Sequence, residues 1–376
     1  MMALSRLGLG KEKYPTLTGV RALGASVVFF DHFSLWPQSG VVLNVMAFFY
    51  TLSGFLIFRI YFERAQLNRQ WLTKYFINRY SRIYPVYFLV LTVLVLVQHQ
   101  WGWKTLLLNY TLTHALFQGA QIILPPSWSL TVEECFYVLA PGLMVLARNR
   151  GAVPMLLVGF AMLGAALLIA RLPISLLHTP DFVLSSTFFG HFLEFFAGAY
   201  VALAVTRAER TSTLHIEGRH RTVIGLVSVM LVGVAMTLVY AHRPFHPHLL
   251  ILLNNFLIPM PIALLYWGLL RENTVLARLL SSRLAGLLGR SSYSFYLLHA
   301  PLIDVFGRGW FIPAFGTRWV SVMVTFVLTW VASTALFLCY EEPLNVYIRN
   351  RFHSKVGWVG LRDTLFRERV EPHKSV

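Results

Sequence analysis

The chain has 376 residues, of which 56% are hydrophobic and only 13% are charged, and its mean hydropathy is +0.61. A soluble domain carries about 25% charged residues, so this composition excludes a soluble protein and indicates an integral membrane protein. A net charge of +16 would favour nucleic acid as the partner of a soluble protein, but here the positions of the charges account for it without nucleic acid.

Ten apolar segments are long enough to cross a bilayer, which predicts an all-α integral membrane protein with about ten transmembrane helices. With a cytoplasmic N-terminus, all lysines and arginines fall on or beside the cytoplasmic side except Lys104, Arg171, Arg243, Arg308 and Arg318. The positive-inside rule therefore predicts that both termini are cytoplasmic, and membrane lipid is the expected partner of the basic excess. The segments lie near residues 18–36, 41–61, 78–97, 127–147, 152–171, 184–206, 222–241, 248–270, 284–307 and 318–340.

The most informative residues of the first segment are Arg21 and His32. Eleven residues make almost three helical turns, so both side chains share one helix face and lie roughly 16 Å apart along the axis. Ionisable groups are costly inside a bilayer and usually mark a site. We therefore expect this helix to link a cation near the cytoplasmic face to a candidate base about halfway across the membrane.

The third segment opens with Arg79 and Arg82, which are three residues apart and share a helix face at the cytoplasmic boundary. Together with Arg21 they would place three guanidinium groups at one level, which suits a polyanion such as a nucleotide phosphate. The alternative is that these arginines only anchor helix ends at the membrane surface. The longest expected outer loop, 98–126, follows this segment and is expected to lie in the interface or to re-enter the membrane.

The fourth segment contains Glu133 and Glu134, two adjacent carboxylates that point about 100° apart on a helix and so do not form a catalytic dyad. Ser129 lies one turn before Glu133, on the same face. One glutamate is expected to face the centre of the bundle. The alternative is that both pair with buried arginine or histidine and only fix the packing.

Two histidine features remain. His299 lies nine residues beyond Arg290, roughly 13 Å from the cytoplasmic side and therefore at a depth like that of His32. A lone helix histidine is more often a packing residue, but two at one depth favour a polar centre. The run His242–His248 invites a metal interpretation, but two prolines and the lack of an acidic partner favour a turn, and no metal site is expected.

Five blocks of the sequence together resemble the acyltransferase-3 family of multispan membrane acyltransferases. They are residues 17–22 with His32, residues 48–57, the pair Arg79 and Arg82, residues 128–137 and residues 294–301, in this order. The chain departs from the family at Thr18, where Asp is usual and would orient Arg21, and at Cys135, where Gln is common. The resemblance covers one membrane domain, 1–343, followed by a basic cytoplasmic tail, 344–376.

The resemblance implies an O-acyltransferase that moves an acyl group, acetyl first of all, from cytoplasmic acyl-CoA to a hydroxyl of a surface polysaccharide or lipid-linked sugar. Arg21, Arg79 and Arg82 would bind the anionic end of acetyl-CoA, and His32 would act as general base or carry the acyl group itself. Glu133, favoured over Glu134 by the family pattern, would orient His32. Supporting roles are expected of Ser53, Ser129 and His299. The expected location is a bacterial inner membrane.

Three alternatives stay open from the sequence, one of them a membrane-anchored scaffold, which would not need Arg21 and His32 on one helix face. A transporter or flippase of lipid-linked glycans would also have about ten spans and a polar centre, although no inverted repeat supports it. An acyltransferase with a succinyl or longer acyl donor would keep the enzyme class and change the substrate. Consumption of acyl-CoA separates the enzymes from the transporter.

Overall fold

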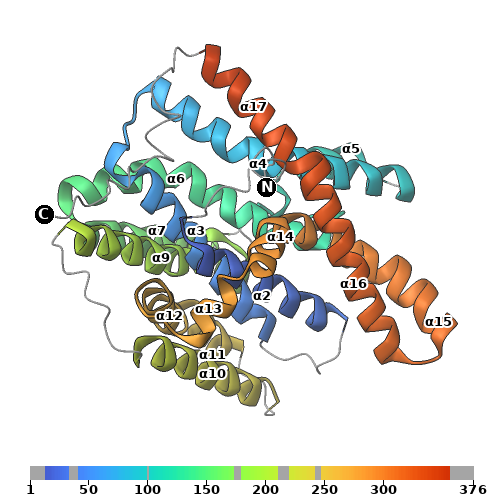
Figure 1. The fold of residues 1–376 in the computed structure, drawn as a ribbon. Coiled ribbons are helices and arrows are strands. Elements are labelled where there is room, and N and C mark those ends of the chain that lie inside the picture. The colour runs from blue at the N-terminus through green and yellow to red at the C-terminus, as the bar shows by residue number, and fades with distance from the viewer. Residues whose placement is uncertain are drawn as a thin grey trace, which may run out of the picture.

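The computed structural model describes residues 13–33, 41–99, 101–172, 179–210, 220–241 and 247–355. Across these ranges helices are the only regular secondary structure, which confirms the all-α fold (Figure 1). The α-helices are α2 (Pro15–His32), α3 (Val41–Tyr61), α4 (Arg69–Gln98), α5 (Trp103–Tyr110), α6 (Trp128–Arg150), α7 (Ala152–Ile169), α8 (Pro180–Ser186), α9 (Phe188–Arg210), α10 (His220–Ala241), α11 (Pro247–Leu252), α12 (Pro259–Arg271), α13 (Val275–Leu280), α14 (Arg283–Leu302), α15 (Ile312–Phe315), α16 (Arg318–Leu336) and α17 (Glu342–Lys355).

Short 3₁₀ and π segments complete the described chain. The 3₁₀ turns are η1 (Phe62–Arg64), η2 (His114–Leu116) and η3 (Pro125–Ser127), and the π-helical segments are η4 (Leu253–Leu257), η5 (Ile303–Phe311) and η6 (Phe337–Glu341). The segment η5 follows α14 directly, so the two form one long helical run. A second run consists of α16, η6 and α17. The last run continues to Lys355, well past the end expected for the final span near residue 340. Residues 356–376 of the expected tail lie outside the described ranges, as do residues 242–246 of the histidine run.

Eight helical stretches in the described ranges are long and apolar enough to cross a membrane: Val45–Arg64, Arg69–Gln98, Pro125–Arg150, Ala152–Ile169, Pro180–Arg210, His220–Ala241, His248–Arg271 and Arg318–Phe352. The first and ninth expected spans correspond to α2 and α14, which are helices but are not among these eight. Both carry polar residues that lower their hydropathy, and they pack against each other. Two helices that are long enough to span but not apolar enough to be among the eight are therefore neighbours.

Glycines allow two helix pairs to approach within backbone contact. A Cβ at Gly289 of α14 would overlap the Thr18 carbonyl oxygen of α2. In the pair formed by α3 and α9 the relation is reciprocal, since a Cβ at Gly54 would overlap the Phe195 carbonyl and one at Gly198 would overlap the Thr51 carbonyl. Small residues serve this purpose in membrane helix pairs, because close backbones gain van der Waals contact that lipid does not supply.

The span that contains α8 and α9 is broken at Thr187, and polar side chains satisfy the carbonyls exposed by the break. Thr187 Oγ1 donates to the Val183 carbonyl at 2.7 Å, His191 Nε2 to that of Ser185 at 3.1 Å, and Asn255 Nδ2 to that of Leu184 at 2.6 Å. Buried backbone groups in lipid must find such partners. These hydrogen bonds give the buried side chains of His191 and Asn255 a structural role.

Glu272, directly after α12, joins the end of that helix to the start of α10. Its two carboxylate oxygens accept hydrogen bonds from the backbone N–H groups of Arg221 and Thr222, both at 2.9 Å. Burial tends to raise the pKa of Glu272, but these hydrogen bonds, from Thr222 first and then Arg221, lower it below its usual range. A carboxylate at a helix N-terminus also complements the helix dipole.

We expect Gly198→Ala to destabilise the protein by about 2 kcal/mol or more, because overpacking in a filled interface typically costs 1–3 kcal/mol. Gly142→Ala is the matched control, since a Cβ at Gly142 meets nothing within 4 Å and alanine has the higher helix propensity. Thermal unfolding of both variants in detergent measures the difference. Equal stability of the two variants would contradict the close contact of α3 with α9.

We expect Glu272→Gln to cost about 1 kcal/mol at neutral pH, the usual magnitude for loss of a helix cap. The contribution of a carboxylate with a lowered folded-state pKa is present above its unfolded value of about 4.3 and is lost as pH falls through the folded value. The unfolding midpoints of wild type and variant should therefore converge in acid. Glu63→Gln, which removes an exposed ion pair with Arg210, serves as control and should cost about 0.5 kcal/mol or less.

Candidate active site

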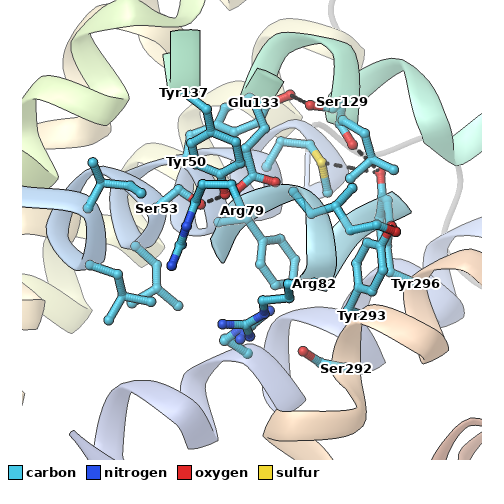
Figure 2. A pocket seen from close by; sticks show the side chains of 18 residues that line it. Tyr50, Ser53, Arg79, Arg82, Ser129, Glu133, Tyr137, Ser292, Tyr293 and Tyr296 are labelled. Atoms are coloured by element: carbon cyan, nitrogen blue, oxygen red, sulfur yellow. Dashed lines mark hydrogen bonds between the residues drawn. The ribbon is translucent and has the colours of Figure 1, made fainter. Parts of the chain in front are cut away.

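A cavity lies between α2, α3, α4, α6 and α14, and six of the expected site residues line it (Figure 2). The open space is about 860 Å³, its mouth included. The expected residues in its wall are Arg21, Ser53, Arg79, Arg82, Ser129 and Glu133. The remaining wall consists of Met46, Phe49, Tyr50, Leu52, Leu56, Ile57, Ile83, Leu130, Tyr137, Ser292, Tyr293 and Tyr296. Residues from five helices, scattered over most of the chain, therefore meet at one place.

Glu133 is the carboxylate of this cavity. It accepts hydrogen bonds from the hydroxyls of Ser53 on α3 and Tyr137, one turn later on α6 (Figure 2). Glu134, the adjacent residue, is not part of the wall. The choice of Glu133 as the inward-facing member of the pair thus agrees with its position, and its partners fix the carboxylate in the cavity wall.

The three arginines differ in how they are held. Arg79 donates to the Tyr61 hydroxyl at 3.3 Å, and its guanidinium lies over the rings of Tyr61 and Tyr137 at 5.4 and 5.9 Å from their centroids. Arg21 and Arg82 make no hydrogen bond or ion pair with any described residue. Two guanidinium groups in the cavity wall are therefore available to a ligand.

Carboxylates do not balance these cations within the cavity. Glu133 is the one acidic residue of the wall against three arginines. Glu341 is buried nearby, where it accepts a hydrogen bond from Ser294 at 2.6 Å and lies close enough for its charge to act on Arg21 and Arg82. Since arginine binds phosphate oxygens through paired N–H groups, the excess positive charge suits a polyanionic ligand.

Tyr296 and Ser129 form one end of the cavity. Their hydroxyls are hydrogen-bonded to each other at 2.8 Å, and both reach the Pro126 carbonyl, at 3.0 and 3.1 Å respectively. The sequence interpretation did not single out Tyr296. Tyr296 lies three residues before His299 and so shares its helix face, but this spacing alone does not mark a tyrosine as part of a site.

His32 and His299 lie beside each other but do not line the cavity. Their ring centroids are 4.9 Å apart, and the His299 ring is 5.5 Å from that of Tyr296. Each histidine has its Nδ1 on a main-chain carbonyl, His32 on Val28 at 3.0 Å and His299 on Tyr296 at 2.7 Å. A carbonyl oxygen accepts a hydrogen bond only from an N–H group. In the neutral form of each ring the proton therefore lies on Nδ1, and Nε2 keeps a basic lone pair.

The candidate residues thus form two groups separated by Tyr296. The hydrogen bonds of Glu133 go to Ser53 and Tyr137 and that of His32 goes to Val28, so the orienting contact expected between Glu133 and His32 is not among the bonds of the described residues. His299 is instead the side chain beside His32, and its ring is fully buried. The described ranges also contain no group of three His, Cys, Asp or Glu side chains that could hold a metal ion.

Comparison with known proteins gives one match. The family described as an acyltransferase domain, acyltransferase-3, matches residues 14–339, a range that includes every residue of the cavity wall and both histidines. No curated protein and no solved structure matches the chain. Since the match covers nearly the whole helical bundle, the chain belongs to the acyltransferase-3 family and is a membrane acyltransferase.

Proposed function

We propose that this acyltransferase transfers an acyl group, acetyl in the first place, from cytoplasmic acyl-CoA to a hydroxyl of a surface polysaccharide or lipid-linked sugar in a bacterial inner membrane. The observation that carries the proposal is the pair Arg21 and Arg82, which face one cavity without a hydrogen bond or ion pair among the described residues. Two such cations in a mostly apolar bundle are costly unless a ligand uses them.

The donor suits this cavity by charge and by polarity. The phosphates of acyl-CoA would bind Arg21, Arg79 and Arg82, through charge-assisted hydrogen bonds. The pantetheine arm is long, flexible and only weakly polar, so it suits the mixed wall between the arginines and Tyr296. The thioester would then reach the end of the cavity where the hydroxyls of Tyr296 and Ser129 lie.

His32, which lies beyond Tyr296 and outside the cavity wall, would act as the general base for attack on a thioester held at this end. Its Nε2 takes the proton of the acceptor hydroxyl, the hydroxyl oxygen bonds to the thioester carbonyl carbon, and the carbon–sulfur bond breaks. The departing thiolate takes up the proton, so the reaction consumes no further reactant. The hydroxyls of Ser129 and Tyr296 would donate to the carbonyl oxygen as negative charge develops on it.

A covalent relay uses the same residues in two steps. His32 Nε2 bonds to the carbonyl carbon as the carbon–sulfur bond breaks and the thiolate leaves. The acceptor hydroxyl oxygen later bonds to that carbon and displaces the imidazole, and the hydroxyl proton is the one that the CoA thiolate gains overall. The basic lone pair on Nε2 supports either path. Intact-mass measurement of the protein after incubation with acetyl-CoA alone distinguishes them, since the relay adds one acetyl group to the wild-type chain and none to His32→Ala.

We expect Arg82→Gln to raise the dissociation constant for acetyl-CoA about tenfold or more, because a hydrogen bond to a charged group typically contributes 1.5–3 kcal/mol. Isothermal titration of the detergent-purified protein measures it. Arg150→Gln, which removes an equal charge from the exposed end of α6, is the matched control and should leave the constant unchanged. An unchanged constant in Arg82→Gln would reject the phosphate-binding role.

We expect His32→Ala to lower acetyl transfer about 10²–10⁴-fold, the usual contribution of a positioned base, while acetyl-CoA binding stays as in wild type. Release of free CoA thiol in the presence of polysaccharide acceptor measures the rate. His248→Ala, at an exposed position on α11, should retain full activity. Full activity in His32→Ala would exclude both the base and the relay, and absence of acyl-CoA turnover in folded wild-type protein would favour a different donor or transport.

A further inference from the structure

Two arginines from distant parts of the chain bind the C-terminal end of α2, where His32 lies. The last carbonyls of a helix have no partner within it. Arg308 Nη2 donates to the His32 carbonyl oxygen at 2.8 Å, and Arg318 Nη2 donates to the Phe33 carbonyl oxygen at 2.9 Å. Cations at this end also oppose the negative pole of the helix dipole.

The two arginines lie on η5 and α16, next to the helix that carries His299. Arg308 belongs to η5, which continues α14 without a break, so it lies on the same helical run as His299. Arg318 is the first residue of α16, which packs against both α14 and η5. The main chain at His32 is therefore fixed to the element that presents the neighbouring histidine.

The surrounding packing makes this attachment specific. Asp304, one turn before Arg308, accepts from its other terminal nitrogen, Nη1, at 2.6 Å and so holds the guanidinium in place. The Phe33 ring is buried against Gly307 of η5, where a Cβ would lie 2.6 Å from Phe33 Cε2. A side chain at Gly307 would thus push the end of α2 away from η5.

We propose that Arg308 and Arg318 are positioning residues that hold the last turn of α2 helical and thereby keep His32 beside His299. The His32 side chain is exposed, and its one hydrogen bond reaches back a single turn to Val28. Its position therefore depends on that turn staying intact. Loss of the turn would move Nε2 from the reacting groups, and a displacement of about 1 Å can cost a factor of about 10² in rate.

The experiment compares Arg308→Ala, Arg308→Lys and Arg318→Ala with Arg171→Ala, which removes a matched charge at the end of α7 without touching α2. Hydrogen exchange across residues 25–33 reads the last turn of α2 directly and needs no substrate. Steady-state acetyl transfer gives kcat and KM. Unchanged elution on size exclusion establishes that each variant is folded, and Arg308→Lys, which keeps a donor of positive charge, tests the site if an alanine variant does not fold.

We expect faster exchange of residues 25–33 in both alanine variants, partial restoration in Arg308→Lys, and wild-type exchange in Arg171→Ala. The kcat should fall about tenfold or more in the alanine variants while KM for acetyl-CoA stays constant, because the arginines of the cavity are untouched. Unchanged exchange would overturn the proposal, and so would a raised KM at constant kcat or faster exchange at full kcat. The rate prediction rests on the proposed function, and if folded wild type turns over no acyl-CoA, that function fails while the exchange measurement still decides the attachment of α2.

Discussion

The backbone contact between α2 and α14 is the constraint on which the rest of the site depends. Gly289 allows the two helices to touch, and the contact brings Arg21 and His32 from one helix against Tyr296 and His299 from the other. Both helices are less apolar than a typical span, so neither gains much by facing lipid. Their mutual burial removes polar groups from the hydrocarbon and places those groups at the centre of the bundle.

The two halves of this helix pair differ in the charged groups that surround them. The half that contains Arg21 joins the cavity, where three arginines meet one carboxylate that two hydroxyls already occupy. The other half ends at two histidines whose Nδ1 atoms are bound to main-chain carbonyls. Binding of an anion and transfer of a proton make opposite demands on local charge, so the separation lets each part keep the environment that its chemistry requires.

Much of the site could be predicted because its residues are polar within apolar segments. The period of the helix places Arg79 with Arg82, and the cost of ionisable groups in a bilayer marks His32 and the pair Glu133 and Glu134. The choice of Glu133 within that pair comes from the family pattern and not from composition or spacing. Tyr296 is different, because tyrosine is common in membrane helices and only its contact with Ser129 from another helix distinguishes it. Contacts between helices depend on how they pack, which a single sequence does not encode in its period.

The same reason explains what the sequence interpretation of the fold lacked. Hydropathy identifies long apolar helices but not the break at Thr187, since the side chains that satisfy its carbonyls come from Thr187 itself, from α9 and from η4. It also ends the ninth span near residue 307, although the π-helical segment η5, which continues α14, runs to Phe311 in the structure. The number of spans remains a prediction, while the helical membrane fold is confirmed.

The wall between the cavity and the histidines is a pair of hydroxyls bonded to each other and to one carbonyl, rather than a layer of packed hydrocarbon. Hydroxyl hydrogens can turn to a new acceptor without any movement of the helices that carry them. Under the proposed function, a thioester carbonyl that reaches this wall would replace the Pro126 carbonyl as acceptor, and the wall would yield by an exchange of hydrogen bonds. In that case an acyl group would pass this wall without any movement of the helices that carry the two hydroxyls.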